Sequence, residues 1–444
     1  MSLRATLLCA ALALGACAPQ APTAPRHVVL ISIDTLRADH LGCYGYPRPT
    51  SPHLDALAAE SVLFEEAWAT APWTLPSHAS LLTGLYPSRH GARAHRRRLA
   101  DVTTLAEQLG AAGVATAAFV NVTFLGRRFG LDRGFDVYER IPNGTRPEGD
   151  AARITDAGLA WLARQGERPS FLFLHYFDLH SDYVALPRFR ERFTDGGRLA
   201  GTTRELMELA GHERQADAAD VAHLIGLYDA SLRQLDQELG RLLDALRADA
   251  RWDDTLLIVT ADHGEEFADH GRFSHGLTHY REILRIPLLM RWPGAAPGAG
   301  RRVDTPVSLV DVAPTVLRAF GLEPPPGLDG VDLAPARAGG ALPEDRVLLA
   351  ETGPGMHDRL RSARAGRFKL ILDPGQAAPR LFDLERDPAE RQNVAGAHPD
   401  EVARLRGAVD RLADGETRLG PRLDLSEATR RHLRELGYAV DEAP

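Results

Sequence analysis

Short, continuously apolar segments of strand length alternate with helical segments along most of the chain. The predicted strands are residues 28–33, 115–120, 171–174, 256–260 and 287–290. The predicted helices between them include residues 51–61, 103–112 and the long segment 217–246. Uninterrupted apolar strands that alternate with helices are typical of a parallel sheet buried on both faces. The pattern therefore predicts an α/β fold with a mostly parallel sheet sandwiched by helices.

A second, smaller unit is expected after the proline-rich residues 324–327. Short strands of antiparallel character are predicted at residues 346–349, 362–364, 368–372 and 381–382, followed by helices at 401–412 and 426–436. Gly437 is a typical stop signal for the last helix. We therefore divide the chain into a large domain, residues 27–325, and a C-terminal α+β subdomain with a terminal helix, residues 345–444.

The N-terminal residues are typical of an export signal. Residues 1–16 carry one arginine and then a short apolar run, too short to span a bilayer. The sequence Leu-Gly-Ala-Cys that ends at Cys17 resembles the lipobox of bacterial lipoproteins. We predict that residues 1–16 are a signal peptide, that Cys17 is acylated, and that residues 17–26 tether the protein to the cell envelope. An ordinary secretory signal cut after Ala16 is the alternative.

Aspartate and histidine residues follow three of the predicted strands. They are Asp34, after the first strand; His175, Asp178 and His180, after the third; and Asp262 and His263, after the fourth. The carboxyl ends of parallel strands meet at one edge of a sheet, where ligands bind. Aspartate and neutral histidine are ligands for divalent transition metals. A metal site is therefore predicted at this edge.

The charge of the chain limits its partners. The formal net charge is −8 at pH 7, which argues against a nucleic-acid-binding protein because such domains are usually basic. Lys369 is the only lysine. An anion site in the large domain must therefore use arginine, histidine, backbone N–H groups or a metal.

Thr74 is the candidate nucleophile. Pro76 favours the first turn of a helix and Gly84 its end, which places Thr74 just before a helix N-terminus. Backbone N–H groups and the helix dipole favour an anion there, and a hydroxyl near a metal can ionise and attack an electrophile. The residues alone leave open whether Thr74 is a nucleophile or only a capping residue.

Several motifs resemble those of the sulfatase family of the alkaline phosphatase superfamily. VVLISIDTLRADHLGCYGY resembles the first metal-binding strand, and TLPSHASLLTGLYPSRHG resembles the nucleophile motif. HYFDLHSDY resembles the D-P-H-x-P-Y segment, TADHGEEFADHG the second metal motif, and FKLIL with LFDLERDPAERQNVA the C-terminal subdomain. The resemblance runs from residue 27 to residue 413. It implies an alkaline-phosphatase-like fold and an enzyme that hydrolyses sulfuric or phosphoric esters.

The resemblance also implies roles for single residues. The metal would be bound by Asp34, Asp262 and His263. Thr74 would stand at the nucleophile position and would also contact the metal. His180 and His275 match substrate-binding histidines that serve in proton transfer. The remaining matches are the substrate-binding candidates His78, His90 and Asp178, and the histidines expected to be structural, His175, His270 and His279. Asp178, His180 and His275 also leave room for a second metal.

The chain departs from the family pattern at the nucleophile. Sulfatases convert a cysteine or serine there to formylglycine, and Thr74 cannot form that aldehyde because its Cβ carries a methyl group. His78 replaces the supporting arginine, Thr35 replaces the second aspartate, and His263 replaces a metal-binding asparagine. This set is more similar to lipoteichoic acid synthases, phosphoethanolamine transferases and nucleotide pyrophosphatases. A histidine ligand favours Mn²⁺ or Zn²⁺ over Ca²⁺, and no formylglycine is expected.

We therefore predict a metal-dependent hydrolase of sulfate or phosphate esters that favours phosphoesters. Its partners would be a small-molecule, glycan or lipid ester and, through the lipid anchor, a membrane. We expect the outer membrane or the periplasmic face. The alternatives are a transferase of phospho-head groups onto envelope glycans or lipids, a formylglycine-independent aryl sulfatase, and a binding lipoprotein without activity. Intact Asp34, Thr74, Asp262 and His263 argue against the last.

Overall fold

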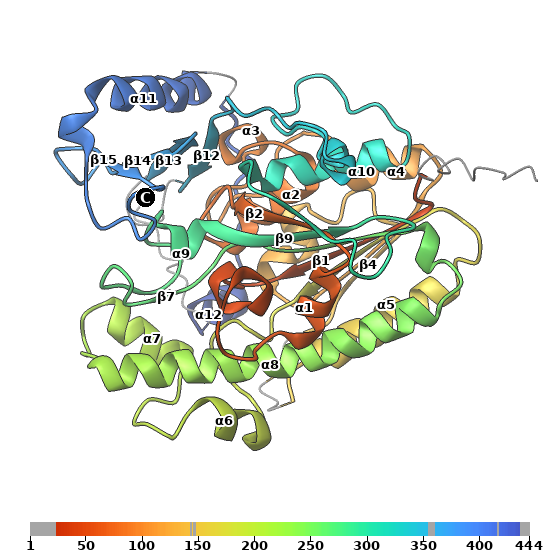
Figure 1. Ribbon diagram of the computed structural model, residues 1–444, viewed down its shortest axis with the longest axis horizontal. Helices are drawn as coiled ribbons and strands as arrows, with labels where there is room; N and C mark the ends of the chain where they lie inside the picture. Colours follow the sequence, from red (N-terminus) through yellow and green to blue (C-terminus); the bar gives the residue numbers. More distant parts are fainter. Residues whose placement is uncertain (1–23, 143, 145–147, 354–359, 415–416, 436–444) are drawn as a thin grey trace, which may run out of the picture.

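A nine-stranded sheet forms the centre of the computed structural model (Figure 1), which describes residues 24–142, 144, 148–353, 360–414 and 417–435. The strand order is β10-β2-β9-β6-β1-β5-β3-β4, and β11 also pairs with β2. The β9 pairings with β2 and β6 are antiparallel, and all other neighbours in the sheet are parallel. The predicted mostly parallel sheet is confirmed.

The strands of this sheet are β1 (His27–Ile33), β2 (Val62–Trp68), β3 (Ala115–Val120), β4 (Val137–Arg140), β5 (Ser170–Tyr176), β6 (Thr255–Ala261), β9 (Arg285–Arg291), β10 (Arg301–Val303) and β11 (Val307–Ser308). The central strands β1, β5 and β6 are buried at every position, as their continuous apolar sequences require. A two-stranded ribbon, β7 (Glu266–Phe267) and β8 (Phe273–Ser274), follows β6.

Helices cover both faces of the sheet (Figure 1). On one face lie α2 (Thr74–Thr83), α3 (Pro87–His90), α4 (Leu105–Ala111) and α10 (Val312–Ala319). On the other face lie α1 (Pro52–Ala58), α5 (Ala151–Ala163) and α8 (Ala218–Ala248). The remaining helices of the large domain are α6 (Pro187–Phe193), α7 (Thr203–Ala210) and α9 (Arg281–Leu284). Although α8 has 31 residues, neither it nor any other described helix has the long apolar stretch that crossing a bilayer requires.

Strand β2 was not predicted from the sequence. Its first residues are buried and apolar, but Glu65 and Glu66 interrupt the pattern. The pairing with β9 is irregular between Phe64 and Ala67, and the two glutamates fall at this irregularity. There they form ion pairs with arginines, Glu65 with Arg302 at 2.5 Å and Glu66 with Arg285 at 3.2 Å.

The C-terminal subdomain is an antiparallel sheet with one helix packed on it. The sheet consists of β12 (Leu348–Glu351), β13 (Arg361–Ala365), β14 (Phe368–Leu372) and β15 (Arg380–Asp383), and α11 (Pro399–Asp414) lies against β13 and β14. Phe368, Leu370 and Leu405 belong to its separate core. The predicted antiparallel character of this unit is confirmed.

The last described segment returns to the large domain. Leu423 N donates to Arg96 O at 2.8 Å, and Arg418 N donates to Ser88 O at 2.7 Å. The helix α12 (Glu427–Glu435) buries Leu433 in the main core. The terminal helix therefore packs on the large domain and not on the small sheet. Gly437, predicted to end it, and Cys17 lie outside the described residues.

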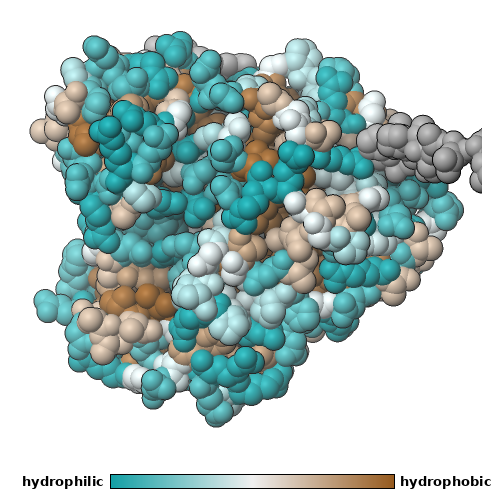
Figure 2. All heavy atoms as spheres, in the orientation of Figure 1, coloured by the Kyte–Doolittle hydropathy of each residue, from teal (hydrophilic) through white to brown (hydrophobic). Residues whose placement is uncertain are grey.

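Figure 2 shows that the visible face is mostly hydrophilic, with a hydrophobic area over α7. Met207 of α7 has 41% of its surface exposed. An exposed apolar side chain such as that of Met207 is ordinary on a protein surface.

Candidate functional site

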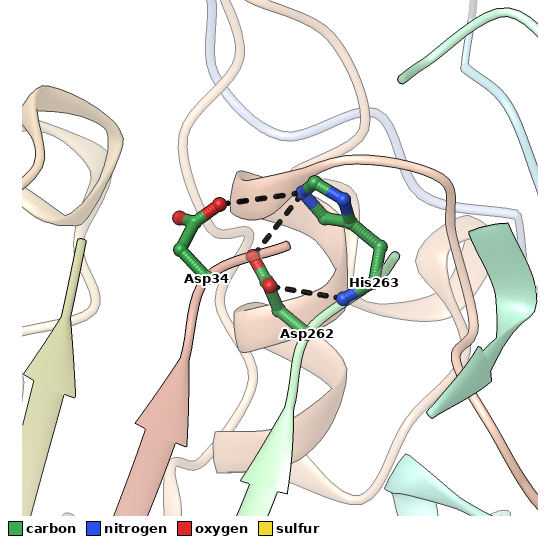
Figure 3. Close-up of side chains that lie close together, drawn as sticks. All are labelled: Asp34, Asp262 and His263. Carbon is green, nitrogen blue, oxygen red and sulfur yellow. Dashed lines mark hydrogen bonds and ion pairs between the residues drawn. The ribbon is translucent and has the colours of Figure 1, made fainter. Parts of the chain in front are cut away.

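Two neighbouring strands place the predicted metal ligands side by side. Strands β1 and β6 are parallel, and their last residues, Ile33 and Ala261, are register partners. The next residues along the chain are Asp34 and Asp262, so both carboxylates leave the sheet at the same point of its carboxyl edge (Figure 3). His263 follows Asp262 directly. The sheet thus brings Asp34 next to Asp262 and His263, which lie far from it in the sequence.

Three side-chain atoms of this group converge without hydrogen-bond partners. They are Asp34 Oδ1, Asp262 Oδ2 and His263 Nε2, all fully buried. His263 Nε2 lies 3.7 Å from Asp34 Oδ1 and 3.4 Å from Asp262 Oδ2 (Figure 3), and the ligand atoms lie within 4.8 Å of one another. His263 Nδ1 is 2.9 Å from Gly264 O, so the Nδ1 proton is donated there and Nε2 keeps its lone pair. Two carboxylates and a neutral imidazole fit a divalent cation.

The electrostatics of the group also favour a cation. Burial raises the pKa of Asp34 from 3.8 to about 7. Burial and the neighbouring Asp34 carboxylate raise the pKa of Asp262 to about 7. Two buried carboxylates this close repel each other unless protons or a cation neutralise them. Among the described residues, this group forms the one cluster with the geometry of a metal site, and Asp178, His180 and His275 do not form a second.

Thr74 lies next to the metal-ligand group. Its Oγ1 donates to Asp34 Oδ2 at 3.4 Å, and the residue is fully buried. The helix α2 begins one residue earlier than predicted, with Trp73 as N-cap, so Thr74 is its first residue. Gly84 ends the helix in the left-handed region (φ +70°), as predicted. The hydroxyl therefore stands at a helix N-terminus and against a carboxylate.

His78 lies one helical turn after Thr74 in α2. Its Nδ1 donates to Thr74 O at 2.8 Å, and its Nε2 is 2.9 Å from Ser32 Oγ. Burial lowers the pKa of His78 to about 4, so the ring is neutral at neutral pH. His78 Nδ1 is also 3.5 Å from Asp262 Oδ2. His78 thus connects the Thr74 backbone to strand β1 and to the metal-ligand group.

His180 and His275 lie together beside the metal-ligand group. Their ring centroids are 4.9 Å apart, and the His275 centroid is 4.6 Å from that of His263. His180 Nδ1 is 2.8 Å from Ser181 O, and His180 Nε2 is buried without a hydrogen-bond partner. Burial lowers the pKa of His180 to about 3 and that of His275 well below its usual value.

The other two substrate-binding candidates, His90 and Asp178, form hydrogen bonds with backbone groups of the fold. His90 Nε2 is 3.1 Å from Pro76 O, and His90 Nδ1 accepts from Ala92 N at 3.2 Å. Asp178 Oδ1 accepts from Asp150 N at 2.7 Å and from Ala151 N at 2.9 Å, at the start of α5. Their predicted contacts with a substrate stay predictions.

The residues expected to be structural divide into two groups. His175 Nε2 is 3.3 Å from Asp34 Oδ2, so His175 orients a metal ligand. His270 and His279 lie at the junction with the C-terminal subdomain: His270 Nε2 is 3.2 Å from Glu390 O, and His279 Nδ1 is 3.0 Å from Ser362 Oγ. In the sequence, the feature that indicates a place in the site for His175 is its position at the carboxyl end of a predicted strand.

Sequence reasoning did not single out Glu265, which also belongs to the site. It is fully buried, and its carboxylate oxygens contact His275 Nδ1 at 3.1 Å and the Tyr183 hydroxyl at 3.0 Å. Burial raises the pKa of Glu265. Its position two residues after His263 was the only signal available in the sequence.

Comparisons with known proteins find a family that matches most of the chain. A family model described as sulfatase matches residues 26–322, and a model described as N-sulphoglucosamine sulphohydrolase, C-terminal, matches residues 268–411. The choline-sulfatase of Rhizobium meliloti is 26% identical over 405 residues, which cover 78% of this chain and 77% of the relative.

Solved structures of similar proteins share the fold. The phosphonate monoester hydrolase of Agrobacterium radiobacter superposes with a TM-score of 0.70 at 24% identity, covering 88% of this chain and 95% of the other. The phosphonate monoester hydrolase from Silicibacter pomeroyi superposes with a TM-score of 0.71 at 25% identity, covering 88% of this chain and 96% of the other.

Proposed function

The chain belongs to the sulfatase family, and on that premise we propose that Thr74 is the direct nucleophile of this ester-hydrolysing enzyme. The observation that carries the proposal is the place of Thr74 Oγ1, 3.4 Å from Asp34 Oδ2 and at the N-terminus of α2. Both neighbours favour ionisation and attack, since the carboxylate can accept the proton and the helix terminus favours negative charge.

Asp34, Asp262 and His263 would hold the cation, through the three converging atoms that have no other partner. A divalent cation there supplies a Lewis acid that favours the ionised Thr74 hydroxyl and polarises the ester. We propose Mn²⁺ or Zn²⁺ in preference to Ca²⁺, because one of the three ligands is an imidazole nitrogen and Ca²⁺ prefers a larger set of oxygens.

The reaction would proceed in two steps. In the first, Thr74 Oγ1 gives its proton to Asp34 Oδ2 and bonds to phosphorus or sulfur, while His180 or His275 protonates the departing ester oxygen. In the second, water attacks the ester on Thr74, its proton returns to the histidine, and Thr74 takes its proton back from Asp34. The neutral His78 holds the Thr74 backbone through both steps.

Threonine favours phosphoesters over sulfate esters in this scheme. A formylglycine hydrate can expel sulfate by re-forming its carbonyl, whereas an ester on Thr74 must wait for external water. Attack of water at phosphorus is well served by a metal and a positioned histidine. The similarity to the phosphonate monoester hydrolase from Silicibacter pomeroyi supports a phosphorus substrate for this chain.

A substrate panel tests the proposal directly. Aryl sulfate, an aryl phosphate monoester and an aryl phosphate diester would each be assayed on metal-free protein supplied in turn with Mn²⁺, Zn²⁺ and Ca²⁺. We expect turnover of at least one phosphoester with Mn²⁺ or Zn²⁺ to exceed that of aryl sulfate. Equal or better aryl sulfate turnover would favour the alternative, a formylglycine-independent aryl sulfatase. The similarity to choline-sulfatase supports a sulfate ester as the substrate class.

We also propose that the protein is anchored to the cell envelope through acylated Cys17. The lipobox-like residues that end at Cys17 support this proposal. Cys17→Ser should release the protein into the soluble envelope fraction and remove the lipid mass from its N-terminal peptide. A wild-type protein that is soluble and carries no lipid would contradict it.

A further inference from the structure

We propose that an arginine-lined cavity, at the same edge of the sheet as the metal-ligand group, binds a second phosphate or sulfate group of the substrate. The enzyme would then favour substrate chains that carry several phosphate or sulfate groups over esters with a single charged group. This inference rests on the proposed function in one respect, namely that Thr74 and the metal-ligand group hydrolyse an ester of the same molecule. The cavity itself takes no part in the chemistry.

The cavity lies between the loop that follows β3 and the last residue of β4, and its volume is about 350 Å³. It is lined by Thr123, Gly126, Arg127, Arg128 and Arg140. Three of these five residues carry a guanidinium group, and none of the five carries a carboxylate. Pockets for small organic ligands begin at about 300 Å³. The cavity therefore has room for a phosphate or sulfate group together with the unit that bears it.

The protein fixes two of the three arginines. Arg127 Nη1 lies 3.1 Å from Asp132 Oδ2, and Arg127 Nη2 donates to Tyr138 O at 2.6 Å. Arg128 Nη1 donates to the hydroxyl of Thr429, which lies on α12. A guanidinium group that is already oriented loses less conformational freedom when it binds an anion. These contacts thus prepare both arginines for a ligand.

Arg140 is the arginine that is left for the ligand. Its side chain is exposed and passes close to Gly126, where a Cβ would lie 3.9 Å from Arg140 Cδ. Its guanidinium group has no hydrogen bond or ion pair with any residue that the structure describes. Of the three arginines, only Arg127 pairs with a described carboxylate, so the cavity keeps a net positive charge. Guanidinium groups bind phosphate and sulfate through paired hydrogen bonds, and the cavity therefore suits a tetrahedral oxyanion.

The position of the cavity relates it to the metal-ligand group. Arg140 ends β4, and its register partner Val120 ends β3. Both strands run parallel to β5 and β1, and Asp34 directly follows β1. Three strand spacings separate β4 from β1 in the sheet, which places the cavity about 15 Å from Asp34 along the carboxyl edge. Ligands of parallel sheets bind at this edge.

The wall of the cavity continues to the nucleophile. Thr123 precedes Phe124, whose ring meets that of Trp73 edge-on with centroids 5.2 Å apart. Trp73 is the N-cap of α2 and directly precedes Thr74. Both aromatic side chains are fully buried, so this connection is rigid. It fixes the distance between the cavity and Thr74, and one extended molecule can occupy both.

The charge of the chain favours an anion that is tethered to the substrate. The formal net charge is −8, so most of the surface repels a free anion. An anion on a substrate that is already bound at the metal has a high effective concentration at the cavity. Binding energy from such a nonreacting group can also orient the ester that Thr74 attacks. The occupant that we infer is therefore a group of the substrate and not a free ion.

A matched pair of substrates tests this inference. Both are 4-nitrophenyl phosphate diesters whose second alcohol carries a flexible polyether tail that can span about 15 Å. One tail ends in a phosphonate, which is joined through carbon and resists ester hydrolysis, and the other ends in a hydroxyl. For wild-type protein with Mn²⁺, we expect kcat/KM to be about tenfold or more higher for the phosphonate-ended substrate. This advantage should shrink at high ionic strength, because the cavity is open to solvent.

Variants of Arg140 connect the advantage to the cavity. Arg140→Gln should lower kcat/KM about tenfold for the phosphonate-ended substrate and less than about twofold for the hydroxyl-ended one, since the uncharged tail forms no ion pair there. Arg140→Glu should reverse the preference. Arg404→Gln is the matched control, because Arg404 is an exposed arginine of α11 whose ion pair with Glu401 stays within that helix. It should change neither value.

The outcomes separate the inference from the proposed function. Equal kcat/KM for the two substrates in wild type, unchanged by Arg140→Gln, overturns the inference and leaves the proposed function standing. Inorganic phosphate that stimulates turnover of the hydroxyl-ended substrate only when Arg140 is present also overturns it, in favour of a free anion. Arg140-dependent binding to phosphatidylglycerol vesicles, with no advantage for the phosphonate-ended substrate, overturns it in favour of a membrane surface. A wild-type protein inactive on both substrates removes the proposed function instead.

Discussion

Asp34 makes separate contacts through its two carboxylate oxygens. Oδ1 faces the metal-ligand group, whereas Oδ2 lies 3.4 Å from the Thr74 hydroxyl and 3.3 Å from His175 Nε2. One side chain thus links the metal-ligand group, the Thr74 hydroxyl and strand β5. Before Thr74 gives up its proton, Asp34 must be ionised if Oδ1 is to bind a cation while Oδ2 accepts from the Thr74 hydroxyl.

Metal binding should therefore depend strongly on pH. Burial raises the pKa of Asp34 and Asp262 from 3.8 to about 7, so the metal-free folded state keeps protons that the unfolded state releases from about pH 4 upward. The metal-free protein should lose stability as pH rises from about 4 to 7. Over the same range metal affinity should rise by about tenfold or more per pH unit and then level off.

Unfolding temperature measures both effects. Dialysed metal-free protein and protein with a fixed free concentration of Mn²⁺ would be compared between about pH 5 and pH 8. We expect the gap between the two unfolding temperatures to widen with pH up to about 7. A gap that stays constant across this range would show that Asp34 and Asp262 do not release protons to the metal.

At the scale of elements, α9 holds the loop that carries Asp262, His263 and Glu265. Gly264 N donates to Ile283 O at 2.7 Å. A Cβ on Gly264 would lie 1.9 Å from Glu282 O and 3.3 Å from Arg37 Cγ. The loop approaches α9 so closely that only glycine fits between them.

Gly264→Ala should consequently disturb the site as well as the fold. The added methyl must push the loop away from α9, which displaces the metal ligands and should weaken metal binding. We expect a stability loss of about 1–3 kcal/mol from overpacking, measured by denaturant unfolding, and a reduced metal content. Gly396→Ala is the matched control, because a Cβ there meets nothing within 4 Å. Equal metal content in both variants would contradict this account of the loop.

The sequence predicts those parts of the site whose residues directly follow the strands of the sheet. Asp34 and Asp262 were placed together because continuous apolar strands indicate a parallel sheet, and the carboxyl ends of its strands share an edge. The nucleophile position of Thr74 came from the family resemblance. The contacts of Glu265 with His275 and Tyr183 depend on how separate loops pack, and no local pattern encodes that packing. Strand β2 is not predicted because two glutamates, which pair with arginines distant in the sequence, interrupt its apolar pattern.

At the scale of the whole molecule, the single lysine joins the two units. Lys369 of β14 is 1% exposed, and its Nζ lies 2.7 Å from Glu390 Oε1 and 4.9 Å from the ring centroid of Trp68 on β2. Glu390 Oε2 accepts from Arg281 N at 2.7 Å, at the start of α9. The Lys369–Glu390 pair thus connects the small sheet to strand β2 of the large sheet and to α9, which contacts the loop that carries Asp262 and His263.

Removing the lysine should destabilise this junction. Lys369→Met leaves the buried Glu390 carboxylate without its cation, and breaking a buried pair in this way costs about 3–5 kcal/mol. The double variant Lys369→Met/Glu390→Gln should recover much of that loss, because no charge is then left buried. Denaturant unfolding of the three proteins measures both effects. A single variant as stable as wild type would mean that the pair is not needed at the junction.

The central claim concerns Thr74, and a trapped covalent intermediate tests it most directly. Wild type turning over an activated aryl phosphate diester with Mn²⁺ would be acid-quenched, digested and analysed by mass spectrometry, with Thr74→Ala and Thr74→Ser in parallel. We predict a phosphoryl adduct on the Thr74 peptide, some turnover with Thr74→Ser, and a loss of about 1,000-fold or more with Thr74→Ala. Turnover by Thr74→Ala at the wild-type rate, with no adduct in wild type, would contradict the claim and leave Thr74 as a capping residue.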